Sequence, residues 1–243
     1  MFGIVTLFSK PVFTTKSRQC ILKNAYNRPS MPFGVLVTGP PGSGKTTCVH
    51  GLSLFLRACG RDICTVNLDP AVIHVPYPCD VDIKDLVCLD EVQEELSLGP
   101  NGGLSYCFDY LEKNYDWLQV KFYHIWYMRT HRVRTAGKHS ASLCEMSGCL
   151  QEKLQPHLKA NKYLLFDCPG QAELFMCHGS FKSLVQTIAG KWHVNLTALQ
   201  LVDSHLCTTP HTYLSALLMC LTSMLNFEVP YVNVLSKVRI WYS

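Results

Sequence analysis

The sequence predicts an α/β fold in which a mainly parallel sheet lies between two layers of helices. Short apolar runs, typical of buried strands, alternate along the 243 residues with longer segments of helical periodicity. A glycine-rich segment lies where the first of these strands would pass into a helix. Hydrophobic residues make up 48% of the chain and charged residues 16%, as in a globular protein with a large core. We therefore expect a three-layer domain.

The glycine-rich segment matches the phosphate-binding pattern G-x-x-x-x-G-K-[ST], because residues 39–47 read Gly-Pro-Pro-Gly-Ser-Gly-Lys-Thr-Thr. The apolar run 33–37 before it predicts a buried strand, and residues 46–59 after it predict a helix that ends at Gly60. A loop in this position directs several backbone N–H groups and a helix dipole at one anion. The sequence therefore indicates a nucleoside phosphate as ligand.

The glycines let the backbone wrap a phosphate without Cβ clashes. The Lys45 ammonium would reach the β- and γ-phosphates, and the Thr46 hydroxyl would bind Mg²⁺. We expect the phosphates to be bound by Gly42, Ser43, Gly44, Lys45, Thr46 and Thr47.

The rest of the chain continues the alternation of strands and helices. After Gly60 we expect a strand over 62–68, a helix with an acidic, solvated face over 81–96, a turn over 98–103 and a helix over 104–119. The second half predicts a strand over 163–166, a helix over 174–189, a strand over 196–202, a helix over 210–226 and a strand over 231–235. This order implies parallel pairing, with helices on both faces of the sheet.

Two aspartates follow predicted strands and would lie at the carboxyl edge of the sheet, where ligands of α/β folds bind. Asp167 precedes a Pro-Gly turn and would hold Mg²⁺ through water, while the Gly170 N–H would sense the γ-phosphate and Gln171 would orient a water. Asp69 precedes a proline, which favours an extended backbone there. Its carboxylate would join the Mg²⁺ shell, polarise the attacking water, or cap the segment that follows.

At these positions the chain resembles the GPN-loop GTPases. The resemblance rests on Gly39–Thr47, Asn67–Ala71, Gly99–Gly103, Phe166–Glu173 and Leu201–Ser204. The Gly-Pro-Asn triplet, placed between the phosphate loop and the Asp-x-Pro-Gly turn, is highly specific for that family. The resemblance covers about residues 33–119 and 152–237, and its details look closest to the second of the three eukaryotic paralogues.

The resemblance implies a P-loop fold that hydrolyses GTP with Mg²⁺ and works as a homodimer or as a heterodimer with a paralogue. Asn101 would reach across the dimer interface toward the partner's γ-phosphate, supplying a fixed dipole where charge develops. Ser236 and Lys237 would lie at the guanine base. The implied role is assembly of RNA polymerases, with their subunits or assembly factors as partners, by a cytoplasmic protein that can shuttle to the nucleus.

Three segments depart from the family pattern. Residues 1–30 are basic, contain no acid and precede the family's own start, so we expect an unstructured extension, with a mitochondrial transit peptide as the alternative. The single GTPase domain would then span residues 31–243. Residues 120–151 interrupt a short helix-to-strand connection. At 238–243 an aberrant tail replaces the family's continuation, so we expect the C-terminal part of the fold to be missing.

One hypothesis accounts for the second and third segments. Both begin with valine, whose codons start with GT, and both follow residues whose codons can end in AG, as at exon–intron boundaries. We therefore expect 120–151 to be a retained intron and 238–243 to be read-through into another, the alternative being a genuine insert and truncation. Arg239 then stands where the family has the aspartate that bonds guanine, so selection of GTP over ATP should weaken.

Composition limits the kinds of partner and compartment that we expect for this chain. Outside the basic segments 1–31 and 120–151 the chain is net acidic, which does not support direct binding of nucleic acid. No apolar run approaches the roughly 20 residues of a membrane helix, and cysteines without any C-x-x-C pair suit a reducing compartment. Two other functions stay open: a non-catalytic nucleotide-binding or assembly module, and a P-loop nucleotide kinase with Arg129, Arg132 and Arg134 in its lid.

Overall fold

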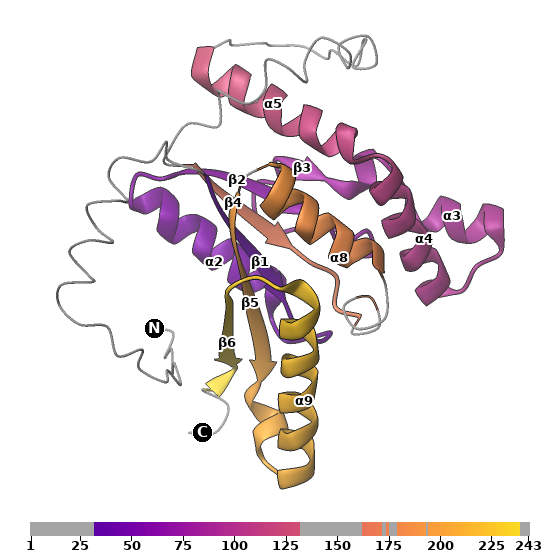
Figure 1. The fold of residues 1–243 in the computed structure, drawn as a ribbon, viewed down its shortest axis with the longest axis vertical. Helices are drawn as coiled ribbons and strands as arrows, with labels where there is room; N and C mark the ends of the chain where they lie inside the picture. The colour runs from indigo at the N-terminus through magenta and orange to yellow at the C-terminus, as the bar shows by residue number, and fades with distance from the viewer. Residues whose placement is uncertain (1–31, 132–161, 172–173, 175–178, 193, 239–243) are drawn as a thin grey trace.

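The computed structural model describes residues 32–131, 162–171, 174, 179–192 and 194–238. In this part of the chain six strands form one parallel sheet in the order β3-β2-β4-β1-β5-β6 (Figure 1). The strands are β1 (Phe33–Thr38), β2 (Asp62–Asn67), β3 (Val81–Asp82), β4 (Lys162–Asp167), β5 (Asn195–Asp203) and β6 (Tyr231–Ser236). The predicted α/β fold with a parallel sheet is confirmed.

Helices cover both faces of this sheet. The α-helices are α2 (Lys45–Ala58), α3 (Leu89–Leu96), α4 (Pro100–Lys113), α5 (Tyr115–His131), α8 (Gly179–Gln186) and α9 (Pro210–Phe227). Shorter turns are the 3₁₀ helices η1 (Ile83–Asp85) and η4 (Ser204–Cys207), and the π-helical turn η3 (Thr187–Lys191) that continues α8. Figure 1 shows α2 on one side of the central strands and α8 on the other.

Side chains that alternate along the central strands belong to the two largest core clusters, one on each face of the sheet. Leu36 and Phe166 belong to a cluster that includes buried residues of α4 and α8. Their chain neighbours Val37 and Leu165 belong to a second cluster, with Val49 of α2. Because β1 and β4 are covered on both faces, they are apolar almost throughout, which is why the sequence predicts them well.

The parallel register brings the carboxyl ends of neighbouring strands to one edge. Asp167 at the end of β4 pairs with Val37 of β1 on one side and with Asn67 of β2 on the other. Asp203 at the end of β5 pairs with Ser236 of β6. The loops that follow β1, β2 and β4 therefore leave the sheet side by side, at the edge where ligands of such folds bind.

The predicted helix over 81–96 is wrong at its start. Val81–Asp82 pairs with the end of β2 as the short edge strand β3, and α3 begins only at Leu89. The Asp82 carboxylate accepts a hydrogen bond from the N–H of Lys84 and so caps the 3₁₀ turn that separates the two. Two residues of strand are too few to show the alternation that would have predicted them.

The predicted turn over 98–103 is also wrong, because helix α4 begins at Pro100 and takes in most of this segment. Proline is tolerated in the first turn of a helix, where its missing N–H would have had no helical partner. The predicted helix over 104–119 is in turn divided at Asn114, whose backbone (φ −122°, ψ 36°) is not helical. The Gly-Pro-Asn triplet is thus the start of a helix.

Of the predicted helix over 174–189, the described part is α8 and the π-helical turn after it. The extension 1–30, the tail from 239 and most of the segment 120–151 lie outside the described residues, so the predictions made for them stay predictions. Helix α5 runs across the start of that segment, from Tyr115 to His131. None of the described helices is long and apolar enough to cross a membrane.

Candidate functional site

The phosphate-binding loop joins β1 to α2 in the predicted way. Its last glycine, Gly44, precedes the helix with a left-handed backbone (φ 91°) that residues with a side chain rarely adopt. No acidic residue lies in the first turn of α2, and the first N–H groups of a helix have no partner within it. The start of α2 therefore presents unpaired donors and the positive end of a helix dipole, which suits an anion.

Lys45, the first residue of α2, lies inside this site with only 8% of its surface exposed. Its Nζ donates a hydrogen bond to the carbonyl oxygen of Pro40, at 3.2 Å. Burial lowers the pKa of Lys45, whereas the negative charges of Asp69 and Asp167 raise it. Both predicted aspartates thus lie close enough to act on the lysine that would meet the phosphates.

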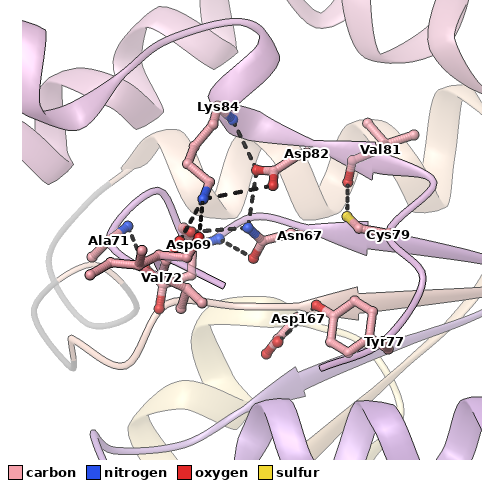
Figure 2. Close-up of polar contacts among 11 residues, drawn as sticks. Asn67, Asp69, Ala71, Val72, Tyr77, Cys79, Val81, Asp82, Lys84 and Asp167 are labelled. Carbon is pink, nitrogen blue, oxygen red and sulfur yellow. Dashed lines mark hydrogen bonds and ion pairs between the residues drawn. The ribbon is translucent and has the colours of Figure 1, made fainter. Parts of the chain in front are cut away.

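Asp167 is the most buried charged group of the site, at 1% exposure. Its Oδ2 accepts a hydrogen bond of 2.9 Å from the hydroxyl of Tyr77, as Figure 2 shows, while its Oδ1 has no hydrogen-bond partner in the part of the chain that the structure describes. Burial raises the pKa of Asp167, an effect that hydrogen bonding from Tyr77 and Thr46 and the charge of Lys45 oppose. The predicted pair Thr46 and Asp167 is therefore brought together.

Asp69 begins the loop between β2 and β3, and its Oδ1 accepts the N–H of Ala71 at 3.0 Å (Figure 2). The Asp69 carboxylate therefore caps the segment that follows it, which is one of the roles that the sequence allowed. Burial raises the pKa of Asp69, while the hydrogen bond from Ala71 and the charges of Lys45 and Lys84 lower it. Its roles toward a metal ion or an attacking water stay predictions.

The turn after β4 packs directly on the phosphate-binding loop. A Cβ atom on Gly170 would lie 2.9 Å from Lys45 Nζ and 3.0 Å from the Cα of Pro41, so a side chain here would displace the lysine ammonium and press on the backbone of the phosphate-binding loop. Gln171, the next residue, is half-buried, and its Oε1 has no hydrogen-bond partner among the described residues. The roles of these two residues toward the γ-phosphate and an attacking water stay predictions.

The remaining predicted residues lie outside this cluster. Asn101 is exposed in the first turn of α4 and makes no hydrogen bond within the described chain. At the ends of β5 and β6, Ser236 Oγ donates to the carbonyl of Val202 at 3.2 Å, and Lys237 Nζ pairs with Asp203 at 2.7 Å. Burial is the largest single influence on Asp203 and raises its pKa, but the hydrogen bonds from Lys237 and the N–H of His205, together with the charges of both residues, hold that pKa below its usual value.

The residues present fit a Mg²⁺ ion. Mg²⁺ prefers oxygen ligands and usually takes one or two from the protein, with water and phosphate supplying the rest. The orphaned Oδ1 of Asp167, beside the hydroxyl of Thr46, provides such oxygens within reach of the phosphate-binding loop. No group of three or more His, Cys, Asp or Glu side chains suited to a metal occurs among the described residues, so a site made of protein ligands alone is not supported there.

Sequence reasoning missed Tyr77, which contacts the site from the loop between β2 and β3. Its only local signal is a tyrosine between two prolines, Pro76 and Pro78. Burial and the neighbouring Asp167 raise the pKa of Tyr77 well above its usual value, so its hydroxyl stays a donor.

The buried charge of Asp167 should cost stability in the nucleotide-free protein. Because its pKa in the folded chain is raised, the cost of its charge is complete above the folded pKa, shrinks as the pH falls below that value, and is gone below the unfolded pKa. Asp167→Asn should therefore raise the melting temperature at pH 7.5 by roughly 2–4 °C, the shift that about 1 kcal/mol gives at this chain length, and change it little near pH 4.

Asp203→Asn is the matched control for this measurement by thermal unfolding. The pKa of Asp203 is lowered, so its charge stabilises the folded chain above that pKa, and the same substitution should lower the melting temperature at pH 7.5. A destabilised Asp167→Asn protein at pH 7.5 would contradict the electrostatic account of the site.

Comparison with known proteins identifies relatives of this chain. A family model described as conserved hypothetical ATP binding protein matches residues 37–128 and 134–242. The GPN-loop GTPase QQT1 of Arabidopsis thaliana is 46% identical over 210 residues, which are 86% of this chain and 59% of that protein. GPN-loop GTPase 2 of Danio rerio is 45% identical over 212 residues, 87% of this chain and 57% of that protein. The chain thus spans less than two thirds of the length of these relatives.

A solved structure supports the fold. The structure of a GTPase in apo form from Pyrococcus abyssi superposes on the chain with a TM-score of 0.63 at 22% identity, covering 86% of this chain and 68% of the other. At that identity the likeness concerns the fold alone. The family model, in contrast, matches most of the chain, and the relatives share one name. The chain therefore belongs to this family of nucleotide-binding proteins, the GPN-loop GTPases.

Proposed function

We propose that this chain binds GTP together with Mg²⁺ and hydrolyses it to GDP and phosphate. The observation that carries the proposal is the free Oδ1 of Asp167, buried beside Lys45 and Thr46 at the start of α2. A carboxylate oxygen left unpaired in such surroundings suits a cation, and the adjacent helix start suits phosphate. The GTPase names of the relatives support the same reaction, although the chain spans only part of their length.

In the proposed reaction a water molecule attacks the γ-phosphorus, and the bond from that phosphorus to the β–γ bridging oxygen breaks. The Lys45 ammonium and the N–H groups at the start of α2 would neutralise charge on the phosphate oxygens. Thr46 and Asp167 would hold Mg²⁺, which when bound neutralises charge on the β- and γ-phosphates. Gln171 would orient the attacking water, and Asp69 would polarise that water or join the metal shell.

Lys45→Ala tests the proposal. Removing the ammonium should lower the rate of GTP hydrolysis by about 100-fold or more, because the developing charge loses its closest counter-ion. Phosphate release is measured with purified protein, with Mg²⁺ and with EDTA. Lys182→Ala, which removes an exposed lysine paired with Glu228, is the matched control and should hydrolyse GTP normally. Nucleotide binding without Mg²⁺-dependent hydrolysis would instead favour a non-catalytic binding module.

The nucleotide base is the second part of the proposal. The family model's description names ATP, whereas the relatives are named GTPases, so both nucleotides need to be compared. Residue 239, where the family has an aspartate that bonds guanine, is arginine and lies outside the described residues. An arginine has no acceptor for the N1–H and amino group of guanine.

The unmodified chain should therefore distinguish GTP from ATP poorly, and Arg239→Asp should restore the preference. Regaining a bidentate, charge-assisted contact is worth about 2–4 kcal/mol, which corresponds to roughly 30- to 1000-fold in relative affinity. Equilibrium titration of both proteins with GTP and ATP measures the ratio. A strong GTP preference in the unmodified chain would show that guanine is recognised elsewhere.

We also propose that the chain works as a homodimer, or as a heterodimer with a GPN-loop paralogue, in the assembly of RNA polymerases. The cytoplasm, with passage to the nucleus, is the proposed location. Helix α9 supports a protein partner, since several of its apolar side chains are exposed, and such patches mark interaction surfaces. The most exposed of these are Leu214, Leu218 and Leu225. Asn101 is exposed at the start of α4, where it is accessible to a second molecule.

Asn101→Ala should lower the rate of hydrolysis by about 10- to 100-fold, because a fixed dipole aimed at the transition state is lost. Nucleotide affinity should stay within about twofold, since the residue does not belong to its own phosphate site. Asn233→Ala, at another exposed asparagine, is the control.

Mixing variants tests whether Asn101 acts on the partner. A Lys45→Ala chain keeps Asn101, and an Asn101→Ala chain keeps an intact phosphate site, so a mixed dimer contains one complete site. Activity should recover when the two proteins are combined. No recovery would place the action of Asn101 within its own chain.

A further inference from the structure

Tyr77 reaches the metal-binding edge of the site from a loop that belongs to neither phosphate-contacting segment. It lies in residues 68–80, between β2 and β3, and is only 4% exposed. Its hydroxyl donates a 2.9 Å hydrogen bond to Oδ2 of Asp167, 90 residues further along the chain. Figure 2 shows the ring directed at this carboxylate from the loop.

The backbone around Tyr77 is held by contacts that do not involve Asp167. Thr65 in β2 donates from its hydroxyl to the carbonyl of Pro78, and its N–H donates to Asp80 Oδ2 at 2.9 Å. At the other end of the loop, Lys84 Nζ donates to the carbonyl of Val72 at 2.6 Å (Figure 2). The tyrosine hydroxyl is therefore a donor whose position is set before any ligand binds.

The carboxylate of Asp167, in contrast, has few restraints of its own. Rotation about its last side-chain bond is soft, Tyr77 donates to Oδ2, and Oδ1 has no hydrogen-bond partner in the described chain. Thr46, which also acts on this carboxylate, is itself expected to bind Mg²⁺, so Tyr77 is the donor that does not depend on the metal. A donor fixed on Oδ2 sets the plane of the carboxylate and so determines the direction in which the orphaned Oδ1 points. Carboxylates that serve metal sites are commonly held in this way by a second hydrogen bond, and the loss of that bond weakens metal binding.

We propose that Tyr77 is a positioning residue for Mg²⁺: by holding Oδ2 of Asp167, it directs Oδ1 toward the metal ion and its water shell. The inference rests on the proposed function, because it assumes that Asp167 serves Mg²⁺. Tyr77 itself touches neither nucleotide nor metal. Its effect should therefore appear only where Mg²⁺ contributes to binding.

Tyr77→Phe removes the hydroxyl and keeps the ring that fills the core. Mg²⁺ should change the affinity of the protein for a fluorescent GDP analogue. In Tyr77→Phe, the Mg²⁺ concentration that gives half of this change should be about tenfold higher than in the unmodified chain. The affinity for the same analogue in EDTA should stay within about twofold. GDP is used because it is not consumed during the titration. The two readouts separate metal positioning from general damage to the site.

Tyr231→Phe is the matched control. Its hydroxyl also donates a 2.9 Å hydrogen bond to a side-chain oxygen, Oε1 of Gln200, in a partly buried setting on β5, two strands from Asp167 in the sheet. This variant should lose comparable stability and leave the Mg²⁺ dependence unchanged. An unchanged Mg²⁺ dependence in Tyr77→Phe, or an equal shift in Tyr231→Phe, would overturn the inference.

A double variant covers the case in which Tyr77→Phe is poorly folded. In an Asp167→Asn background, adding Tyr77→Phe should change the Mg²⁺ dependence no further, because the group that Tyr77 positions is gone. An additional, independent effect would show that Tyr77 acts by another route and would contradict the proposal. If the unmodified chain shows no effect of Mg²⁺ on GDP affinity, the proposed function fails instead, which is a distinguishable outcome.

Discussion

A carboxylate buried to 1% exposure, as that of Asp167 is, must be compensated by nearby charges and hydrogen bonds, or it destabilises the fold. Lys45 supplies the opposite charge, and the hydroxyl of Tyr77 supplies a hydrogen bond to one oxygen. The other oxygen is left without a partner in the described chain. The nucleotide-free protein is therefore under electrostatic strain at this point, and a cation bound with a phosphate is the kind of ligand that would relieve it.

The sheet explains why these groups meet. Because β1 lies between β4 and β5, and β4 lies between β1 and β2, the loops that leave these strands are neighbours at one edge. The turn at Gly170 packs against the backbone of Pro41, and Tyr77 joins the β2–β3 loop to the end of β4. Three loops separated by tens of residues in sequence are thus mechanically connected.

The sequence was sufficient for features that depend on local pattern. The strands covered on both faces are apolar almost throughout, and the phosphate-binding loop needs glycines and a lysine at fixed spacing, so both could be predicted. The start of α4 could not, because tertiary packing determines it: a Cβ atom on Gly103 would lie 2.9 Å from both Gln93 and Leu89 of α3. That close approach lets a helix form over residues of weak helix propensity. Nor could local pattern show that Tyr77 faces an aspartate 90 residues away.

The central claim is that Thr46 and Asp167 share a metal ion at the phosphate-binding loop. Crystals grown with Mn²⁺ and a non-hydrolysable GTP analogue would test it through the anomalous scattering of manganese. The account predicts one strong peak between the Thr46 hydroxyl and the Asp167 carboxylate, bordering the phosphates held at the start of α2. A bound nucleotide with no peak there, or with manganese held by other residues, would contradict it.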